Sequence, residues 1–202
     1  MDELALIEQA REGDLDAFNH LVIAYQDMVF SLAARMLGDD DAAADVTQTA
    51  FLSAYRSLNT FRGGSFRAWV MRMATNACYD ELRRRKRHPA VSLEPVNEED
   101  EEIESPAWLA DDAVTPEGAL EQAELEEALE ACLQALPEDF RAVVVMVDIE
   151  GLDYQEAALS CGAPLGTVKS RLARARLKMR DCLRKYWELL PSIYRLDDED
   201  LP

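Results

Sequence analysis

The stretch that decides the fold is LDYQEAALSCGAPLGTVKSRLARARLKMRDCL, residues 152–183. At its centre, Gly162-Ala163-Pro164 combines a glycine, which permits positive φ, with a proline, which favours the first turn of a new helix. The pattern therefore predicts a helix over Tyr154–Ser160, a tight turn, and a second helix that begins at Leu165.

The second predicted helix has one apolar side and one basic side. The apolar side chains recur at helical spacing and are Leu165, Val168, Leu172, Ala175 and Met179. On the other side, small residues allow close approach to a surface, and cations suit phosphates and guanine edges. The residues that we single out there are Lys169, Ser170, Arg171, Ala173, Arg174 and Arg176. This arrangement favours a helix-turn-helix in a DNA major groove over another acidic partner or a merely solvated face.

The charge of the chain is unevenly distributed. Its 202 residues carry a formal net charge of −19, which taken alone argues against a nucleic-acid partner. However, of the 21 Lys and Arg residues, eight lie in Arg62–Arg87 and eight lie in Lys169–Lys185. Two basic patches separated by an acidic segment indicate two contacts with DNA.

The first basic patch lies in FRGGSFRAWVMRMATNACYDELRRRKR, residues 61–87. Aromatic residues alternate with cations here, which is typical of single-stranded DNA capture, because rings stack on unpaired bases and cations follow the backbone. Asn76, Asp80 and Arg83 share one helix face, where an amide can read a base edge and Asp80 can orient Arg83. For the aromatic residues taken singly, a place in the core is the commoner alternative.

Several other classes of protein are disfavoured. The four cysteines form no C-x-x-C pair and have no histidine at ligand spacing, so we expect no metal site and four reduced thiols. The sequence shows no signal peptide and no apolar run of ~20 residues, so we expect a cytoplasmic protein without direct membrane insertion. With two histidines and no phosphate loop or triad, we expect no catalytic residues, no cofactor and no enzyme activity.

Helical periodicity runs through the whole chain, and no convincing strand pattern appears, so we predict an all-α fold. The remaining predicted helices cover Glu3–Arg11, Asp14 to about Leu37, Ala42–Leu58, Phe66–Arg87 and Ala119–Leu136, with another opened by Pro137. Residues 92–118 contain ten Asp or Glu and no Lys or Arg, which predicts a flexible linker. The predicted organisation is a helical domain over 1–90, an acidic linker over 91–118, a helix-turn-helix domain over 119–185 and an acidic tail over 186–202.

Four stretches, taken together, resemble the extracytoplasmic-function (ECF) sigma factors, the short two-domain transcription initiation factors of bacteria. They are DVTQTAFLSAYRSLNTFRG (45–63), AWVMRMATNACYDELRRRKR (68–87), LPEDFRAVVVM (136–146) and YQEAA…GAPLGTVKSRLARAR (154–176), in family order. The resemblance implies a sigma2-like bundle that binds core RNA polymerase and melts the −10 element. It also implies a sigma4-like domain that reads the −35 element. The expected function is promoter-specific initiation of transcription.

The resemblance also implies roles for single residues. Asp45 and Gln48 match positions that face the β′ clamp helices of the polymerase, and the β flap is a further expected contact. The −10 candidates, which include the helix face found above, are Phe61, Arg62, Asn76, Asp80, Arg83 and Arg84. The −35 candidates are Lys169, Ser170, Ala173 and Arg174 in the groove, with Arg171 and Arg176 on phosphates. The expected partners are core RNA polymerase and promoter DNA, both duplex and melted, and an anti-sigma factor is a further candidate.

Two alternatives stay open on the sequence. An operator-binding regulator uses the same helix-turn-helix, usually as a dimer on paired half-sites, but leaves residues 61–87 unexplained. A helical scaffold that binds only protein would be indifferent to DNA. Changing Lys169 and Arg174 to alanine distinguishes these alternatives, because only a DNA-binding protein then loses its dependence on DNA.

Overall fold

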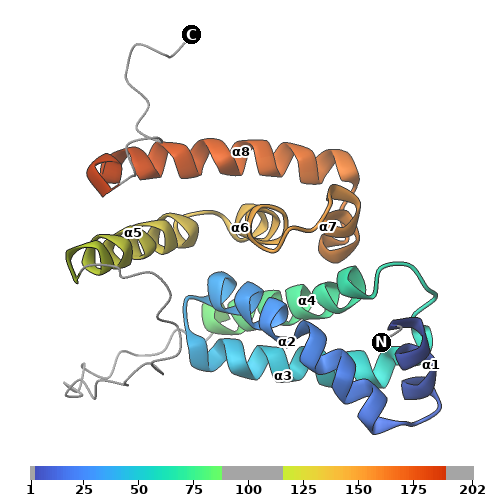
Figure 1. Ribbon diagram of the computed structural model, residues 1–202. Helices are drawn as coiled ribbons and strands as arrows, with labels where there is room; N and C mark the ends of the chain where they lie inside the picture. Colours follow the sequence, from blue (N-terminus) through green and yellow to red (C-terminus); the bar gives the residue numbers. More distant parts are fainter. Residues whose placement is uncertain (1–2, 88–115, 190–202) are drawn as a thin grey trace.

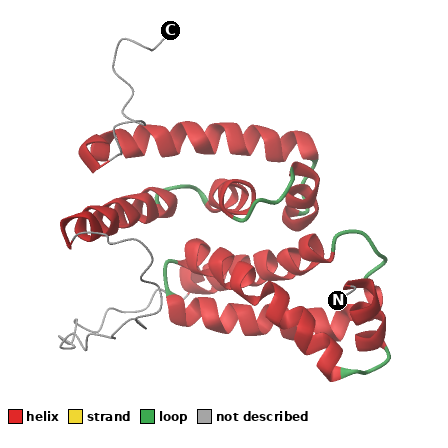
Figure 2. Ribbon diagram, in the orientation of Figure 1, coloured by secondary structure: helices red, strands yellow, loops and turns green. Residues whose placement is uncertain are grey.

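A computed structural model describes residues 3–87 and 116–189 of the chain, and within these ranges every regular element is a helix (Figures 1 and 2). The elements are α1 (Glu3–Arg11), α2 (Leu15–Leu37), α3 (Asp40–Ser57), η1 (Leu58–Thr60), α4 (Phe66–Arg87), α5 (Pro116–Gln134), α6 (Glu138–Val144), η2 (Val145–Ile149), α7 (Tyr154–Cys161), α8 (Leu165–Leu183) and η3 (Arg184–Leu189). The all-α prediction is confirmed. Helix α5 begins at Pro116, inside the predicted linker, whereas residues 88–115 and 190–202 lie outside the described residues.

Local capping explains where the N-terminal helices begin and end. The Asp14 carboxylate accepts hydrogen bonds from the backbone N–H groups of residues 16 and 17 and so starts α2. Gly38 ends α2 in the left-handed conformation, with φ of 64°, and Asp39 then caps α3. The predicted helix that starts after Asp14 and ends near Leu37 is therefore confirmed.

The helix-turn-helix predicted from residues 152–183 is also confirmed. Asp153 and Glu156 form a reciprocal capping box at the start of α7. Gly162 ends that helix with φ of 60°, and Pro164 precedes the first residue of α8. One expectation about α8 is wrong, because Leu165 is 38% exposed. Its side chain points toward the helix N-terminus, where no preceding turn of the same helix covers it.

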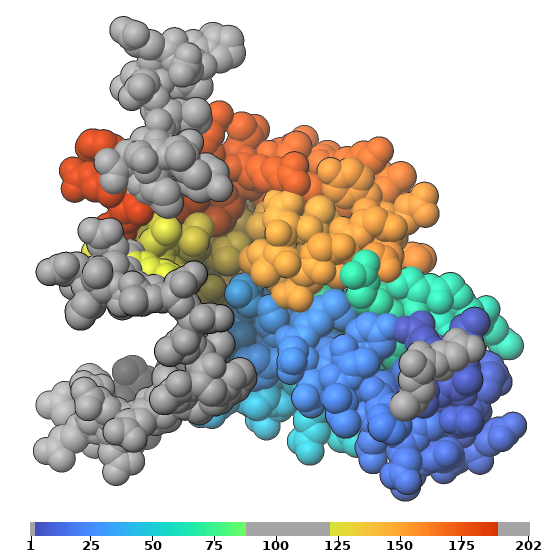
Figure 3. Space-filling view, in the orientation of Figure 1, coloured from blue at the N-terminus to red at the C-terminus, as the bar shows by residue number. Residues whose placement is uncertain are grey.

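The chain forms two halves that pack directly on each other. In the N-terminal half, residues 3–87, helices α2, α3 and α4 form a bundle, and α1 packs against α2. In the C-terminal half, residues 116–189, α8 lies over α5, α6 and α7 (Figure 1). The largest contact between the halves joins α4 to α7, and the two halves lie directly against each other (Figure 3). The buried apolar residues of both halves form one continuous core. The composition of the sequence did not predict this close association.

Polar contacts cross the boundary between the halves near α7. The Glu156 carboxylate pairs with Arg67 and accepts a hydrogen bond of 2.7 Å from the Ser65 hydroxyl. The Ser160 hydroxyl, which is 1% exposed, donates to the carbonyl of Ala68 at 3.0 Å. Although burial acts in the opposite direction, the hydrogen bonds from Arg67 and Ser65 hold the pKa of Glu156 below its ordinary value. These contacts fix α7 against the start of α4.

A second set of polar contacts surrounds Arg141 of α6, which is only 7% exposed. Its guanidinium donates to the carbonyl of Met36 at 2.6 Å, to the carbonyl of Leu136 at 3.2 Å, and to both the side chain and the backbone of Gln134. The Gln134 amide in turn donates to the carbonyl of Arg35 at 2.8 Å. Arg141 and Gln134 therefore join the end of α2 to the C-terminal half. Their hydrogen bonds go to carbonyl groups at the end of a helix, which have no N–H donor within that helix.

The expectation that all four cysteines are reduced is wrong for two of them. Cys132 of α5 and Cys182 of α8 form a disulfide, with their Cα atoms 5.8 Å apart. They are separated by 50 residues, and only the packing of α5 on α8 brings them together. A search for closely spaced cysteines misses such a pair. Cys78 and Cys161 are free thiols in or beside the core.

We predict that Arg141→Met lowers the free energy of unfolding by about 2–4 kcal/mol, because it leaves buried carbonyl groups without donors. Chemical denaturation followed by circular dichroism measures the change. Arg56→Met, on an exposed part of α3, is the matched control and should shift stability by less than about 0.5 kcal/mol. Equal effects of the two substitutions would contradict the role assigned to Arg141.

Candidate nucleic-acid interface

Helix α8 presents the predicted DNA-reading residues together on one exposed side. Val168, Leu172 and Ala175 are buried against the rest of the C-terminal half. The exposed residues on the other side include four of the predicted groove contacts, namely Lys169, Ser170, Ala173 and Arg174. The ammonium of Lys169 lies 5.8 Å from the ring centre of Tyr154 in α7. The result is a basic surface with small residues at its centre, which suits close approach to a duplex groove.

The other two −35 candidates, Arg171 and Arg176, hold carboxylates of the C-terminal half. Arg171 pairs with Asp139 of α6, and Asp139 also accepts a hydrogen bond of 3.0 Å from the Tyr79 hydroxyl of α4. Arg176 pairs with Asp148, with its Nε atom 3.0 Å from Oδ2, and this hydrogen bond raises the pKa of Arg176. The sequence did not indicate either pair, because the partners lie 32 and 28 residues away.

The π-helical segment η2 explains why Asp148 meets α8. This segment continues α6 with a wider turn, which ends when the N–H of Glu150 donates to the carbonyl of Val145 at 2.9 Å. Single π turns are rare and often occur at functional sites. Here the turn places Asp148 beside the exposed side of α8, where its carboxylate faces Arg176.

In the N-terminal half, an aromatic cluster supports the loop between η1 and α4. The ring centres of Phe61, Phe66 and Trp69 lie 5.4–5.5 Å apart, and Phe61 is only 4% exposed. Arg11 of α1 donates to the Phe61 carbonyl. Gly63 adopts a positive φ of 91°, which reverses the chain at the exposed loop. The ring of Phe61 thus belongs to the core, which is the alternative to base stacking that we considered for the aromatic residues.

The remaining −10 candidates are accessible. Arg62 in the loop and Asn76 on α4 are exposed. The expected contact between Asp80 and Arg83 is confirmed, because their side chains form an ion pair at 2.7 Å. Arg84 forms two hydrogen bonds with Glu81, at 2.7 and 2.9 Å. Both of these arginines are largely exposed and stay available to a phosphate backbone.

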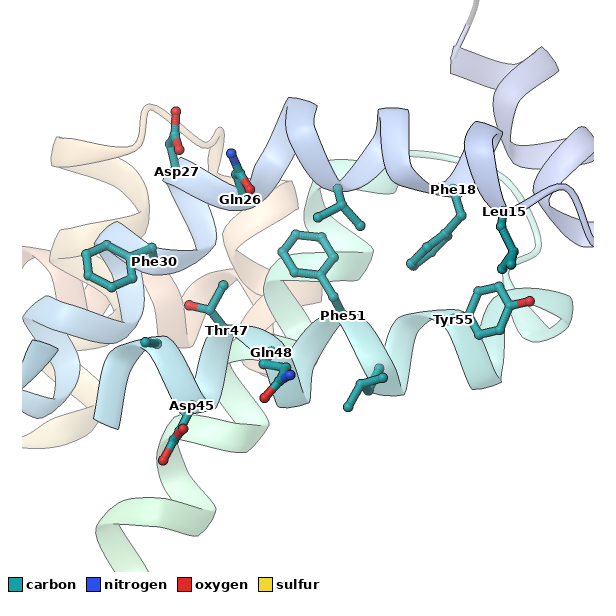
Figure 4. A pocket seen from close by; sticks show the side chains of 13 residues that line it. Leu15, Phe18, Gln26, Asp27, Phe30, Asp45, Thr47, Gln48, Phe51 and Tyr55 are labelled. Carbon is teal, nitrogen blue, oxygen red and sulfur yellow. The ribbon is translucent and has the colours of Figure 1, made fainter. Parts of the chain in front are cut away.

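A separate apolar groove runs between α2 and α3 (Figure 4). Its walls include the exposed side chains of Phe30, Leu52 and Tyr55. The two candidate polymerase contacts, Asp45 and Gln48, also line this groove and are exposed. In Figure 4, Asp45 extends from α3 away from α2, so it stands at the rim. An apolar groove with polar groups at its edge fits an amphipathic partner helix.

Comparison with known proteins agrees with this geometry. The model of Sigma-70 region 2 matches residues 21–88, and that of Sigma-70 region 4 matches residues 126–179. The chain is 39% identical to RNA polymerase sigma-H factor of Pseudomonas aeruginosa over 85% of its length and 88% of the relative. It is 36% identical to ECF RNA polymerase sigma-E factor of Escherichia coli K12 over 87% of its length and 91% of the relative.

Solved structures show the same fold. A structure of CnrH in complex with the cytosolic domain of CnrY matches with a TM-score of 0.62 and 26% identity, covering 90% of this chain and 96% of that one. The sigma factor RpoE of Bartonella quintana, in a co-crystal with the anti-sigma factor NepR, matches with a TM-score of 0.62 and 22% identity, covering 84% and 98%.

These findings define the class as a sigma-70 type protein with regions 2 and 4. The chain belongs to the ECF sigma factors of bacterial RNA polymerase. It is accordingly a transcription initiation factor that acts in promoter-specific transcription. Across residues 3–87 and 116–189, none of the helices has the length and apolar character needed to cross a membrane.

We predict that Asp139→Asn raises the affinity for a short random-sequence duplex about two- to fivefold, because Arg171 then becomes available to phosphates. The measurement is fluorescence anisotropy over a salt series, in which the salt dependence should also steepen. Glu124→Gln on the exposed part of α5 is the matched control with the same change in charge. If the control raises the affinity as much, net charge explains the effect and Arg171 does not.

Proposed function

We propose that the protein acts in the cytoplasm as a sigma factor that binds core RNA polymerase and reads two promoter elements. The C-terminal half contacts the −35 element, and the N-terminal half binds and stabilises the melted −10 region. The observation that carries this proposal is the exposed side of α8, where Lys169, Ser170, Ala173 and Arg174 lie together on a confirmed helix-turn-helix. The domain limits 1–90 and 119–185 are part of the same proposal.

At the −35 element, the small residues Ser170 and Ala173 allow α8 to lie deep in the major groove. Arg174 is the candidate for a bidentate contact with guanine, the commonest specific contact of an arginine. Arg171 and Arg176 bind phosphates in this proposal, and each must first exchange its carboxylate partner for DNA. This exchange lowers the affinity for unrelated DNA, because only a well-placed duplex replaces both carboxylates.

At the −10 element, Asn76 and Arg62 provide the exposed polar groups that meet a flipped base and its backbone. Phe61 acts indirectly, because its buried ring anchors the start of the loop that carries Arg62. Asp80 holds Arg83 in place, and Arg84 adds a further cation along the single strand.

For polymerase binding, the groove between α2 and α3 accommodates an apolar helix face, and Asp45 and Gln48 add polar contacts at the edge. The matching partner in this proposal is the β′ clamp helices, with the C-terminal half against the β flap. The solved relatives that form complexes with an anti-sigma factor or with CnrY support an inhibitory protein as a further partner of this chain.

The two halves have to separate when both elements are bound. Elements centred near −35 and −10 are about 25 base pairs apart, which is roughly 85 Å of duplex at 3.4 Å per pair. Helices α4, α7 and α8 are stacked in contact, and each helix-to-helix step spans about 8–10 Å. The closed arrangement is therefore far too short to reach both elements, and we propose that it belongs to the unbound protein.

We predict that run-off transcription on genomic DNA with core polymerase yields new discrete transcripts when this protein is added. Arg174→Ala should cost about 1–3 kcal/mol of sequence discrimination at the upstream element.

Asn76→Ala should impair promoter opening, measured by permanganate reactivity of unpaired thymines, while upstream binding is retained. The matched control is Asn19→Ala, on an exposed part of α2 that belongs to neither patch.

Binding to core polymerase provides the other arm of this experiment. The double variant Asp45→Ala and Gln48→Ala should lose core association and keep its affinity for duplex DNA. Duplex binding by the unaltered protein without affinity for core would contradict the proposal and favour an operator-binding regulator. A palindromic footprint in the absence of polymerase would point to the same alternative.

A further inference from the structure

The disulfide between α5 and α8 lies outside every surface assigned above. Cys132 lies near the C-terminal end of α5 and is 1% exposed, whereas Cys182 lies in the last turn of α8 and is half-buried. Their Cα separation of 5.8 Å lies within the usual range for a disulfide. We propose that Cys132 and Cys182 form a reversible, oxidant-responsive site that fastens α5 to the helix-turn-helix and releases it on reduction.

Helix α5 is weakly held without this bond. Of its residues with described side chains, from 122 to 134, only Ala128, Cys132 and Leu133 are buried. The helix contacts α8, η3 and the end of α2, but its apolar contact is limited to about two turns. A crosslink that spans 50 residues removes much of the freedom of the open state. The disulfide therefore contributes much of the stability with which α5 is held against α8.

The other cysteines are poor competitors for an oxidant. Cys78 is fully buried, and burial raises the pKa of its thiol to about 12. Cys161 is partly buried, and burial raises the pKa of its thiol to about 11. Because the thiolate is the reactive form, both remain inert near neutral pH. The half-buried position of Cys182 leaves one sulfur of the pair open to a small reagent.

The chemistry is ordinary thiol–disulfide exchange with a low-molecular-weight disulfide such as oxidised glutathione. The Cys182 thiolate attacks one sulfur of the reagent, and one glutathione thiolate leaves. The Cys132 thiolate then attacks the Cys182 sulfur, the mixed disulfide breaks, and the second glutathione leaves. The protein loses two electrons and two protons, and the reagent gains them. In a reducing cytoplasm, the location given under the proposed function, such a bond forms on oxidative challenge and is reversed afterwards.

Release of α5 increases the maximum distance that the connection between the two halves can span. While α5 is fastened, the packed part of the C-terminal half begins near Ala128. After release it begins near Leu136, and the hydrogen bond from Gln134 to the Arg35 carbonyl at the end of α2 is lost with α5. The eight residues 128–135, about 12 Å long at the helical rise, then add to the connection between the halves. The oxidised protein therefore accepts a narrower range of spacings between its two DNA elements.

The first test follows alkylation and hydrogen exchange in the full-length, unaltered protein. Oxidised glutathione should protect Cys132 and Cys182 from iodoacetamide, and dithiothreitol should restore their reaction. Reduction should speed amide exchange in α5 at least tenfold, leave α1 and α3 unchanged, and lower the Tm by about 5–10 °C. Cys182→Ser should behave like the reduced protein in both states, whereas Cys161→Ser should respond like the unaltered protein.

Two results would overturn the proposal. One is equal alkylation of Cys132 and Cys182 with and without oxidised glutathione. The other is a disulfide that forms without any change in the amide exchange of α5.

A second experiment compares oxidised and reduced protein on promoters with lengthened spacers. The reduced form should tolerate more added base pairs. Equal tolerance would refute the proposed increase in the distance between the halves. If no promoter is transcribed in either state, the proposed function fails, whereas the alkylation result stands by itself.

Discussion

The contact between α4 and α7 is the constraint on which the rest of the structure depends. It joins the two halves through Glu156, which meets both Ser65 and Arg67, and through the buried Ser160 hydroxyl. Glu156 also belongs to the capping box that starts the helix-turn-helix. The same carboxylate therefore stabilises the DNA-binding motif and holds it against the other half. The apolar core continues through this contact without interruption.

This arrangement places the two proposed DNA-binding surfaces in one compact body while leaving the outer side of α8 exposed (Figure 3). The polar contacts between the halves involve carboxylates, hydroxyls and backbone carbonyls, which water can solvate when the halves part. Arg171 shows the consequence most clearly, because its partner Asp139 is also bound by Tyr79 of the other half. Under the proposed function, a phosphate that draws Arg171 from Asp139 therefore also disturbs the contact between the halves.

Much of the fold was predictable from the sequence, because its signals are local. Asp14, Gly38 and Gly162 mark helix ends through capping and backbone geometry, and the structure confirms them. The exposure of Lys169 and Arg174 followed from helical spacing in the same way. The family resemblance supplied the overall function, which the comparisons with sigma factors support.

Contacts between distant parts of the chain were not predictable. The bond between Cys132 and Cys182, the pairing of Arg176 with Asp148, and the burial of Arg141 all depend on how helices pack. Helical periodicity identifies which face of a helix is apolar, but it does not identify the helix that covers it. For the same reason, the roles of Asn76 and Asp45 remain proposals, since exposure alone is compatible with several partners.

The most direct test of the account measures the distance between the halves in solution. Donor and acceptor dyes on exposed positions 56 of α3 and 155 of α7, attached through unnatural amino acids, report it by energy transfer. We predict high transfer in the free protein and a clear loss of transfer when core polymerase and a promoter with both elements are added. High transfer that persists in a transcriptionally active complex would contradict the claim that the two halves separate to read the promoter.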